Sequence, residues 1–468
     1  MSTSRSEHHL VIGRKDAGTP AVLLLRGALG WALPCVELDE QRAADASLIN
    51  RAARDLLGGE VSVLRCLRDD PTGSVRQQVH DLDVHTAQWG PPAHGVWLTR
   101  FELDTASLAR PEQGAILDRW FTERHAHAWS PDGRDWVLPG WRDEAIAWAE
   151  QELARRGLPR VDAVEQVRVW EFSHVLRLHT AAGQIYLKAR PLSGANEPHL
   201  TRYLAQQFPA WTPVVLAIDA ERRWLLMRAS VGPALMDTRD LARWEQAAET
   251  CARIQIGCIG RSAELMALGC PVRPLDWLEA EIPPLLDDTA ALQPVDAEAL
   301  TDAEVAEVRG LRSELQAMCR EVAALGVPLS LEHGDLWGVN VIAEERDCVL
   351  IDWEDACVAH PFLSAFLLLA SPEHSDALAG LPDAHARIRT AYLGPWRQWA
   401  TAERWPAGRL ERAFDLTQRL AGAHYAVQFR RFALPVIETS WEVRAFAPLF
   451  LRALLRARRA ESGAPGRA

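Results

Sequence analysis

The stretch from Leu331 to Ala356, LEHGDLWGVNVIAEERDCVLIDWEDA, holds two acidic centres separated by a short hairpin-like run. The first is His333-Gly334-Asp335, with Asn340 five residues after the aspartate, and the second is Asp352, which follows an apolar run. A loop that carries Asp335 and Asn340 and returns into a strand ending at Asp352 can bring three side-chain oxygens to one point. Phosphoryl transfer needs such a set, because one carboxylate must sit beside the attacking hydroxyl while a carboxylate and an amide oxygen hold Mg²⁺ against the nucleotide phosphates.

The segments HGDLWGVN and IDWEDA resemble the catalytic-loop and metal-site motifs of the aminoglycoside phosphotransferase and choline kinase family, a branch of the protein-kinase-like fold. The resemblance implies that Asp335 is the catalytic base, that Asn340 and Asp352 bind Mg²⁺, and that His333 is a scaffold for the loop. It also implies a bilobal α+β fold with a small β-rich N-lobe and a large helical C-lobe. By the same resemblance, the phosphate donor is ATP or GTP. The alternative is a polar loop with a metal-free hydrogen-bond network, since a motif is a hypothesis until its structural context is known.

Length and composition limit the class of protein. A chain of 468 residues is long enough for two or three domains, and 48% hydrophobic with 24% charged residues is typical of soluble globular proteins. The net charge of −12 argues against a nucleic-acid partner. The N-terminus has no apolar signal-peptide core, the apolar runs are too short to span a membrane, and the eight cysteines include no Cys-x-x-Cys pair. We therefore expect a cytoplasmic protein without a membrane partner; the oligomeric state is left open.

Residues 1–130 are expected to form a small α/β domain. Gly30–Pro34 is expected to be a loop, and helices are expected at Gln41–Leu57 and Pro111–Arg124. The expected strands are short apolar runs, at HLVI and AVLLLR within residues 9–27, Val61–Cys66, Ser74–Val79 and Gly95–Phe101.

This region has a second resemblance, to the Nudix fold. Trp31–Glu37, WALPCVE, and the following Arg51–Gly58 look like the loop and helix of a Nudix box. In that family the helix carries several metal-binding glutamates, whereas here the matching positions hold Ala52, Asp55 and Leu56. Glu37 and Glu40 fall on the expected upstream loop. The resemblance implies an accessory Nudix-like fold without hydrolytic activity, and an unrelated α/β domain is the alternative.

Residues 131–160 are expected to be a linker with a packing helix at Trp141–Gly157, and residues 161–232 to be the N-lobe. Three alternating runs, EQVRVW, HVLRLHT and QIYLKA, match the nucleotide-covering hairpin of the kinase-like family, in which Ser173 and backbone N–H groups would contact phosphate. By resemblance, Lys188 pairs with the nucleotide α- and β-phosphates. It is the only lysine after Lys15, in a chain that otherwise uses arginine.

The next helix is expected at Asn196–Gln207, and Glu197, at its extreme start, is the candidate partner of Lys188. Leu225–Arg228 resembles the hinge segment, so that Met227 would lie beside the adenine. Residues 233–460 are expected to be the helical C-lobe, and residues 461–468 a disordered tail. Its expected helices include single ones at Ala297–Leu325 and Leu410–Phe432.

The short segment Glu354–His360 leaves no room for a peptide-docking region after Asp352, which favours a small hydroxyl-bearing acceptor. Its selectivity groups are expected among Glu354, Asp355, Glu438 and Glu442. A second class of function also stays open: a non-catalytic regulatory protein whose kinase-like part binds nucleotide. The joint presence of Lys188, Asp335, Asn340 and Asp352 favours the enzyme.

Overall fold

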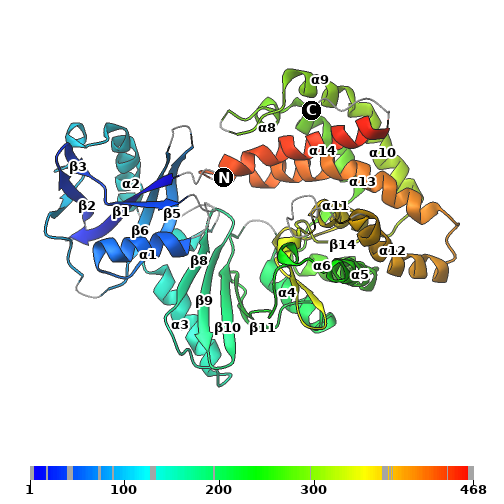
Figure 1. Cartoon of the computed structure of the whole chain (residues 1–468), viewed down its shortest axis with the longest axis horizontal. Helices are drawn as coiled ribbons and strands as arrows, with labels where there is room; N and C mark the ends of the chain where they lie inside the picture. Colours follow the sequence, from blue (N-terminus) through cyan, green and yellow to red (C-terminus); the bar gives the residue numbers. More distant parts are fainter. Residues whose placement is uncertain are drawn as a thin grey trace. The chain divides into compact units, whose positions relative to one another are not determined.

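The structure is a computed structural model that describes residues 5–16, 19–39, 46–71, 75–86, 89–126, 133–192, 195–295, 297–371, 378, 381, 383–439 and 441–461. The chain forms two compact units (Figure 1). The first comprises Met1–Ser193 together with the short segment Ile437–Ser440, and the second comprises Gly194–Val436 with Trp441–Ala468. The expected tail beyond residue 461 and Glu40 lie outside the described residues.

The first unit begins with a mixed sheet in the order β3-β2-β1-β6-β5, to which β4 and β7 add by pairing with β1 and β2. Its strands are β1 (Arg5–Asp16), β2 (Thr19–Gly27), β3 (Gly30–Ala32), β4 (Cys35–Asp39), β5 (Val61–Asp70), β6 (Arg76–Val84) and β7 (Gly95–Thr99). Strands β1 and β6 run parallel, whereas the other pairs are antiparallel. The apolar run Ala21–Leu24 of β2 is buried on both faces, which explains why it does not alternate.

Two helices pack against this sheet (Figure 1). Helix α1 (Ala46–Leu57) buries Ala46, Ile49, Ala53 and Leu57, which share one helical face. Helix α2 (Gly114–Ala126) follows a 3-10 turn at Pro111–Gln113. The predicted loop at Gly30–Pro34 was wrong at its start, because Gly30, at a φ of +120°, closes a tight hairpin in which β3 pairs with β2. Glu37 likewise lies in β4, not in a loop.

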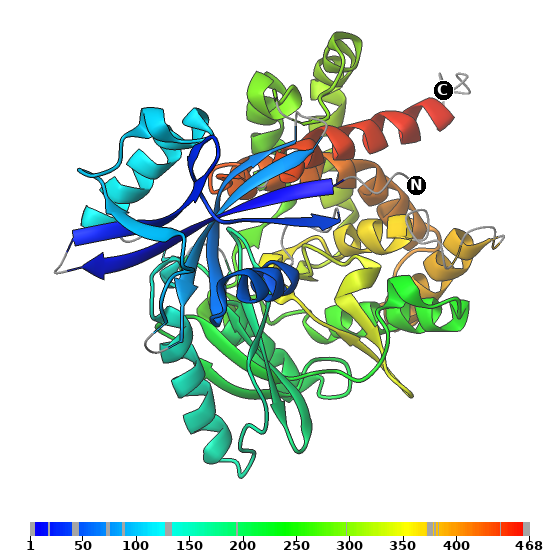
Figure 2. The same cartoon turned by 60° about the vertical axis from the view of Figure 1, so that its left-hand side comes forward.

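The first unit continues with helix α3 (Trp141–Ala154) and the antiparallel strands β8 (Glu165–Val169), β9 (His174–Thr180) and β10 (Gly183–Ala189), as predicted. Figure 2 shows α3 (teal) beside these strands. The alternation in β9 is strict, with inward positions such as Leu176 and Leu178 fully buried.

The second unit is largely helical and contains only short strands. It starts with α4 (Glu197–Gln207) and the hairpin β11 (Val215–Asp219) and β12 (Trp224–Arg228). Its remaining strands are β13 (Val272–Arg273), β14 (Ser330–Glu332), β15 (Val341–Ala343), β16 (Cys348–Leu350) and β17 (Cys357–Ala359). Its further helices are α5 (Leu241–Gly257), α6 (Ser262–Ala267), α7 (Leu275–Asp287), α8 (Thr289–Leu292), α9 (Asp302–Gly310), α10 (Arg312–Leu325), α11 (Ser364–Ala370), α12 (Ala384–Ala402), α13 (Arg409–Gln428) and α14 (Phe446–Glu461).

Two apolar clusters hold this unit together, and the loops that carry Asp335, Asn340 and Asp352 lie between strands that contribute to these clusters. One cluster joins α4, α5 and α12 to β15 and β16 through residues such as Trp244 and Leu350. The other joins α7, α9, α10, α13 and α14, and includes Cys357 of β17. The α+β class is therefore confirmed. None of the helices in the described part of the chain is both long enough and apolar enough to cross a membrane.

Two predicted helices were wrong in extent. The expected single helix at Ala297–Leu325 is two helices, since α9 begins at residue 302 behind a capping box of Thr301 and Glu304 and ends at Gly310. The helix predicted at Leu410–Phe432 leaves α-geometry after Gln428 and continues as a π-helix over Phe429–Ala433.

Candidate active site

The two acidic centres of the sequence are packed directly against each other through their backbones. Gly334, at a φ of +83°, lies so close to the 3-10 turn Trp353–Asp355 that a Cβ atom would sit 2.4 Å from the carbonyl oxygen of Asp355. Only glycine combines this left-handed conformation with so close an approach. The glycine of the His-Gly-Asp motif therefore lets the loop of Asp335 contact the turn that follows Asp352.

His333 links the same two segments by its side chain. Its Nε2 donates to the carbonyl of Ile351 at 3.1 Å, and its Nδ1 accepts from the backbone N–H of Asp335 at 3.3 Å. Burial lowers the pKa of His333 to about 4, so the imidazole is neutral at physiological pH, as this pair of hydrogen bonds requires. The ring also lies 4.4 Å from that of Trp353. These contacts join the loop of Asp335 to the segment that leads to Asp352, and the scaffold role of His333 stays a prediction.

Asn340 holds the carboxylate of Asp335 from within the loop. Its Nδ2 donates to both the backbone carbonyl and Oδ2 of Asp335, each at 2.8 Å. The carbonyl of Asn340 accepts from the backbone N–H of Ile351 at 3.0 Å, at the end of the β15–β16 hairpin. The amide Oδ1 of Asn340 accepts no hydrogen bond from the described residues, which leaves it available to a cation.

Asp352 has a left-handed backbone, with φ 67° and ψ 60°, at the N-cap of the turn Trp353–Asp355. A non-glycine residue pays a strain of about 1–3 kcal/mol for such a conformation, and such strain persists where the surroundings impose it, often at functional sites. The preceding residue, Ile351, is fixed through both of its backbone groups, since its carbonyl accepts from His333 and its N–H donates to Asn340.

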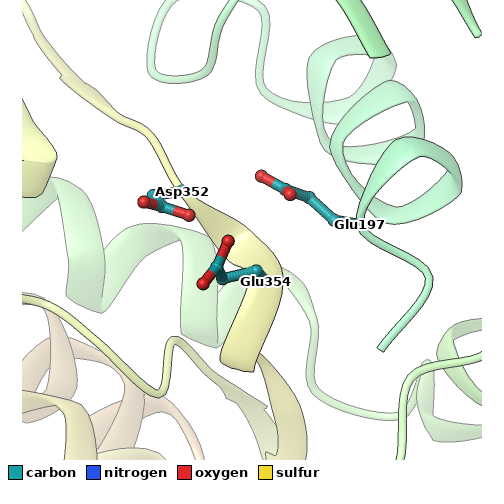
Figure 3. A group of neighbouring side chains, drawn as sticks. All are labelled: Glu197, Asp352 and Glu354. Atoms are coloured by element: carbon teal, nitrogen blue, oxygen red, sulfur yellow. The ribbon is translucent and has the colours of Figure 1, made fainter. Parts of the chain in front are cut away.

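Three carboxylates converge beside this turn. Ligand oxygens of Glu197, Asp352 and Glu354 all lie within 4.8 Å of one another, with Glu197 reaching in from the first turn of α4 (Figure 3). Glu197 and Glu354 are buried. Closely spaced carboxylates in a partly buried setting repel one another unless a cation neutralises them. Oxygen donors of this kind fit a hard divalent cation such as Mg²⁺.

A fully buried carboxylate, Glu332, lies next to the loop that carries Asp335 and was not predicted from the sequence. It accepts from the N–H of Gly334 at 2.9 Å and from the hydroxyls of Tyr425 and Ser364 at 3.1 and 3.3 Å. Burial alone would raise the pKa of Glu332, but hydrogen bonding and charge from His424, together with the other donors, take it below its ordinary value. Its position next to the His-Gly-Asp motif was the one feature of the sequence that could have drawn attention to Glu332. The neighbouring residues do not reveal that this glutamate is buried.

The nucleotide-contact candidates are distributed over both units. Lys188 and Ser173 belong to the first unit: Lys188 is buried in β10 opposite Val175, and the buried Ser173 accepts a hydrogen bond from the Trp170 indole at 2.9 Å. Met227 belongs to the second unit, where it is half-buried in β12 opposite Val215.

The residues expected to select the acceptor lie in different parts of the structure. Glu354 faces the carboxylate cluster, whereas Asp355 is exposed. Glu438 lies in the first unit and forms an ion pair with Arg134 at 2.6 Å, and Glu442 lies in the 3-10 helix Trp441–Ala445 of the second unit.

Comparison with protein families shows to which family the chain belongs. The model of the phosphotransferase enzyme family matches residues 163–403, just over half of the chain. The chain belongs to this phosphotransferase family. The match spans Lys188, Asp335, Asn340 and Asp352, and it confirms the resemblance of the two motifs. A comparison with curated protein sequences gave no match.

Several solved structures are similar to this phosphotransferase. A choline/ethanolamine kinase family protein from Mesorhizobium loti is 14% identical, with a TM-score of 0.45 over 67% of this chain and 94% of its own. A macrolide 2'-phosphotransferase type I is 15% identical, with a TM-score of 0.44 over 66% and 96%. A choline kinase from Streptococcus pneumoniae is 13% identical, with a TM-score of 0.44 over 68% and 99%.

Proposed function

We propose that this phosphotransferase moves the γ-phosphate of ATP, or of GTP, to a hydroxyl of a small molecule. One observation carries the proposal: the carboxylate of Asp335 is held by Asn340 in a loop whose backbone packs against the Asp352 turn. A base for the acceptor and oxygen ligands for a phosphate-bound cation are therefore close together. The family match, which spans these residues, supports the same reaction class.

In this proposal Asp335 orients the acceptor hydroxyl and takes its proton on the carboxylate. The hydroxyl oxygen forms a bond to the γ-phosphorus as the bond to the β-phosphate bridging oxygen breaks, which releases the nucleoside diphosphate. The hydrogen bond from Asn340 Nδ2 occupies one side of the Asp335 carboxylate and so fixes the direction in which its other oxygen faces. Such fixed placement contributes to catalysis because phosphoryl transfer depends chiefly on positioning and electrostatics.

Mg²⁺ is the metal that this donor set fits. Asp352 and the free Oδ1 of Asn340 would hold it, with Glu354 as a further carboxylate of the same cluster. When bound, the ion would offset the negative charge of the nucleotide phosphates. We assign Lys188 to the nucleotide α- and β-phosphates, with Glu197 as its candidate partner, Ser173 to the phosphate-covering loop and Met227 to the adenine side.

The acceptor is proposed to be aminoglycoside-, choline- or sugar-like. Strand β17 begins at Cys357, directly after the Asp352 turn, and it is buried between β13 and β14. This leaves no segment for docking a peptide. The exposed Asp355 is a carboxylate that could select a cationic acceptor. Use of ATP, together with eight unpaired cysteine thiols, supports a cytoplasmic location.

The test is a panel of aminoglycosides, amino alcohols and sugars, with ATP or GTP and Mg²⁺, read out as coupled ADP or GDP release and by mass spectrometry of the product. We expect a product heavier by one phosphoryl group for at least one acceptor class. Tight nucleotide binding without phosphorylation of any acceptor would instead support the regulatory alternative.

A further inference from the structure

We infer that the N-terminal α/β region supports the nucleotide-covering hairpin and holds it in place. Within the hairpin, Glu171 is the residue that positions the loop. The inference rests on the proposed function, in which the loop between β8 and β9 covers the nucleotide phosphates. All the contacts that carry it lie within the first unit, which contains residues 1–193 and the returning segment Ile437–Ser440.

Strand β8 is fastened to the α/β sheet by one buried side chain. The amide of Gln166 donates to the carbonyl of Val63 at 2.6 Å and accepts from the N–H of Val63 at 2.9 Å. Its oxygen also accepts from Asn50 of α1 at 2.6 Å. Gln166 thereby satisfies both backbone groups of a strand residue in β5, as a neighbouring strand would.

The start of β9 is fixed from the other side. His174 is buried and lies against the rings of Trp136 and Trp141, with centroids 6.4 and 4.4 Å away. Its Nε2 is 3.1 Å from the amide nitrogen of Gln166. Residues on both sides of the loop are therefore anchored, and the stretch expected to be a linker contributes Trp136 to this packing.

The loop itself is held by a segment from near the other end of the chain. Oε1 of Glu171, which is 6% exposed, accepts from the backbone N–H groups of Glu438 and Thr439 at 3.1 and 2.8 Å. The hydroxyl of Thr439 donates to the same oxygen at 3.3 Å. Glu438 is in turn fixed by Arg134 at 2.6 Å, next to the turn that carries Trp136.

This arrangement explains why the loop can do without glycines. Two consecutive N–H groups that converge on one carboxylate oxygen form a strong, directional contact, because hydrogen bonds to an ionised acceptor exceed neutral ones. Arg190 adds a hydrogen bond to the carbonyl of Phe172. A loop fixed in this way presents its backbone N–H groups to phosphate in one conformation, so less ordering is needed on binding.

The experiment compares wild type with Glu171→Ala, Glu171→Gln and the control Glu221→Ala, which removes an exposed carboxylate in the β11–β12 turn. Calorimetry measures affinity for Mg²⁺ with the non-hydrolysable ATP analogue AMP-PNP, and for adenosine, which has no phosphates. We expect about tenfold weaker AMP-PNP binding for Glu171→Ala, since a charge-assisted contact is lost, and adenosine affinity within about twofold of wild type. Glu171→Gln keeps an oxygen acceptor, so its affinity for AMP-PNP should fall less than that of Glu171→Ala.

A second pair of variants tests the same contact from the returning segment. Thr439→Pro removes the N–H that donates at 2.8 Å, whereas Thr439→Ala keeps it. Only the proline variant should weaken AMP-PNP binding markedly and speed hydrogen–deuterium exchange across residues 170–173. Unchanged AMP-PNP affinity in both Glu171→Ala and Thr439→Pro would overturn the inference alone. Wild-type protein that binds neither AMP-PNP nor the GTP analogue GMP-PNP would instead overturn the proposed function on which the inference rests.

Discussion

The side-chain amide of Asn340 donates hydrogen bonds of 2.8 Å to both the backbone carbonyl and the carboxylate of Asp335. The two residues are therefore held together, so that the amide nitrogen orients the proposed base while the amide oxygen is the proposed cation ligand. Because the carbonyl of Asn340 also accepts from Ile351, this unit is coupled to the segment that leads to Asp352. The proposed base and metal ligands thus lie on one loop and at the end of the short hairpin that follows it.

Asp335→Asn tests the base. The substitution keeps the shape of the side chain but removes its capacity to accept a proton, so turnover should fall ~10²–10⁴-fold while nucleotide affinity changes little. Steady-state kinetics with an acceptor from the proposed panel, together with nucleotide calorimetry, measure the two effects. The control is Asp347→Asn, the same change in the β15–β16 turn. Near-wild-type turnover of Asp335→Asn would refute the assignment.

Asp352→Ala and Glu354→Gln test the metal cluster. Removal of Asp352 should abolish the Mg²⁺ dependence of nucleotide binding, since this carboxylate would hold the ion that offsets the phosphate charge. Glu354→Gln should weaken Mg²⁺ affinity to a smaller extent, because it removes one charge of a three-carboxylate cluster. Calorimetric titration of Mg²⁺ at fixed nucleotide measures both, and Glu345→Gln controls for an exposed charge in the nearby turn. If wild type and all three variants showed the same Mg²⁺ dependence, the metal would not be bound by this carboxylate cluster.

Lys188→Ala tests the phosphate contact proposed for β10. The variant should lose affinity for ATP while retaining that for adenosine, because only ATP carries the charge that an ammonium group attracts. Lys188→Arg should not restore full affinity, since a planar guanidinium is a different shape from the compact ammonium at a buried position. Equal losses for ATP and adenosine would indicate a general disturbance of β10 and not a phosphate contact.

The neutral state of His333 predicts acid sensitivity. Its folded pKa of about 4 lies below the ordinary 6.5, so the unfolded chain binds the proton more readily between these values. The contribution of His333 to the free energy of unfolding is complete above about pH 6.5. It is lost as the pH falls toward 4, and the free energy of unfolding then drops by up to about 1.4 kcal/mol per pH unit. Urea unfolding of wild type and His333→Asn at several pH values measures this. The variant should show a shallower pH dependence, and an identical slope would contradict the assignment.

The N-terminal α/β region should not hydrolyse nucleoside diphosphate derivatives. The positions where the Nudix family carries helix-borne glutamates hold Ala52 and Leu56, and the exposed Asp55 is the sole acid on α1. Glu37 lies on β4 and pairs with Arg5 at 2.7 Å. An isolated carboxylate binds a hard divalent cation weakly. The full chain should be assayed with nucleotide sugars, dinucleotides and Mg²⁺ or Mn²⁺, and turnover that disappears in Asp55→Ala would make the protein bifunctional.

The sequence alone was sufficient for those parts of the site that depend on local order. Asp335, Asn340 and Asp352 follow one another along a single loop and hairpin, and the predicted closeness of Asp335 and Asn340 is seen in their hydrogen bonds. That Asp352 joins them around one cation stays a prediction. Most helices and strands were likewise predicted, because apolar periodicity is a property of consecutive residues. The alternation in β9 is an example.

Only the tertiary structure decided which residues far apart in the sequence contact one another within each unit. In the second unit Glu197 shares a cluster with Asp352 and Glu354, and the buried Glu332 accepts from Tyr425. In the first unit Thr439 returns to hold Glu171. No local pattern marks such residues, because a glutamate in a short turn has the same neighbours in sequence whether it faces solvent or a carboxylate. Their environment is set by how the whole chain packs, and burial then determines whether a charge must find donors or a cation.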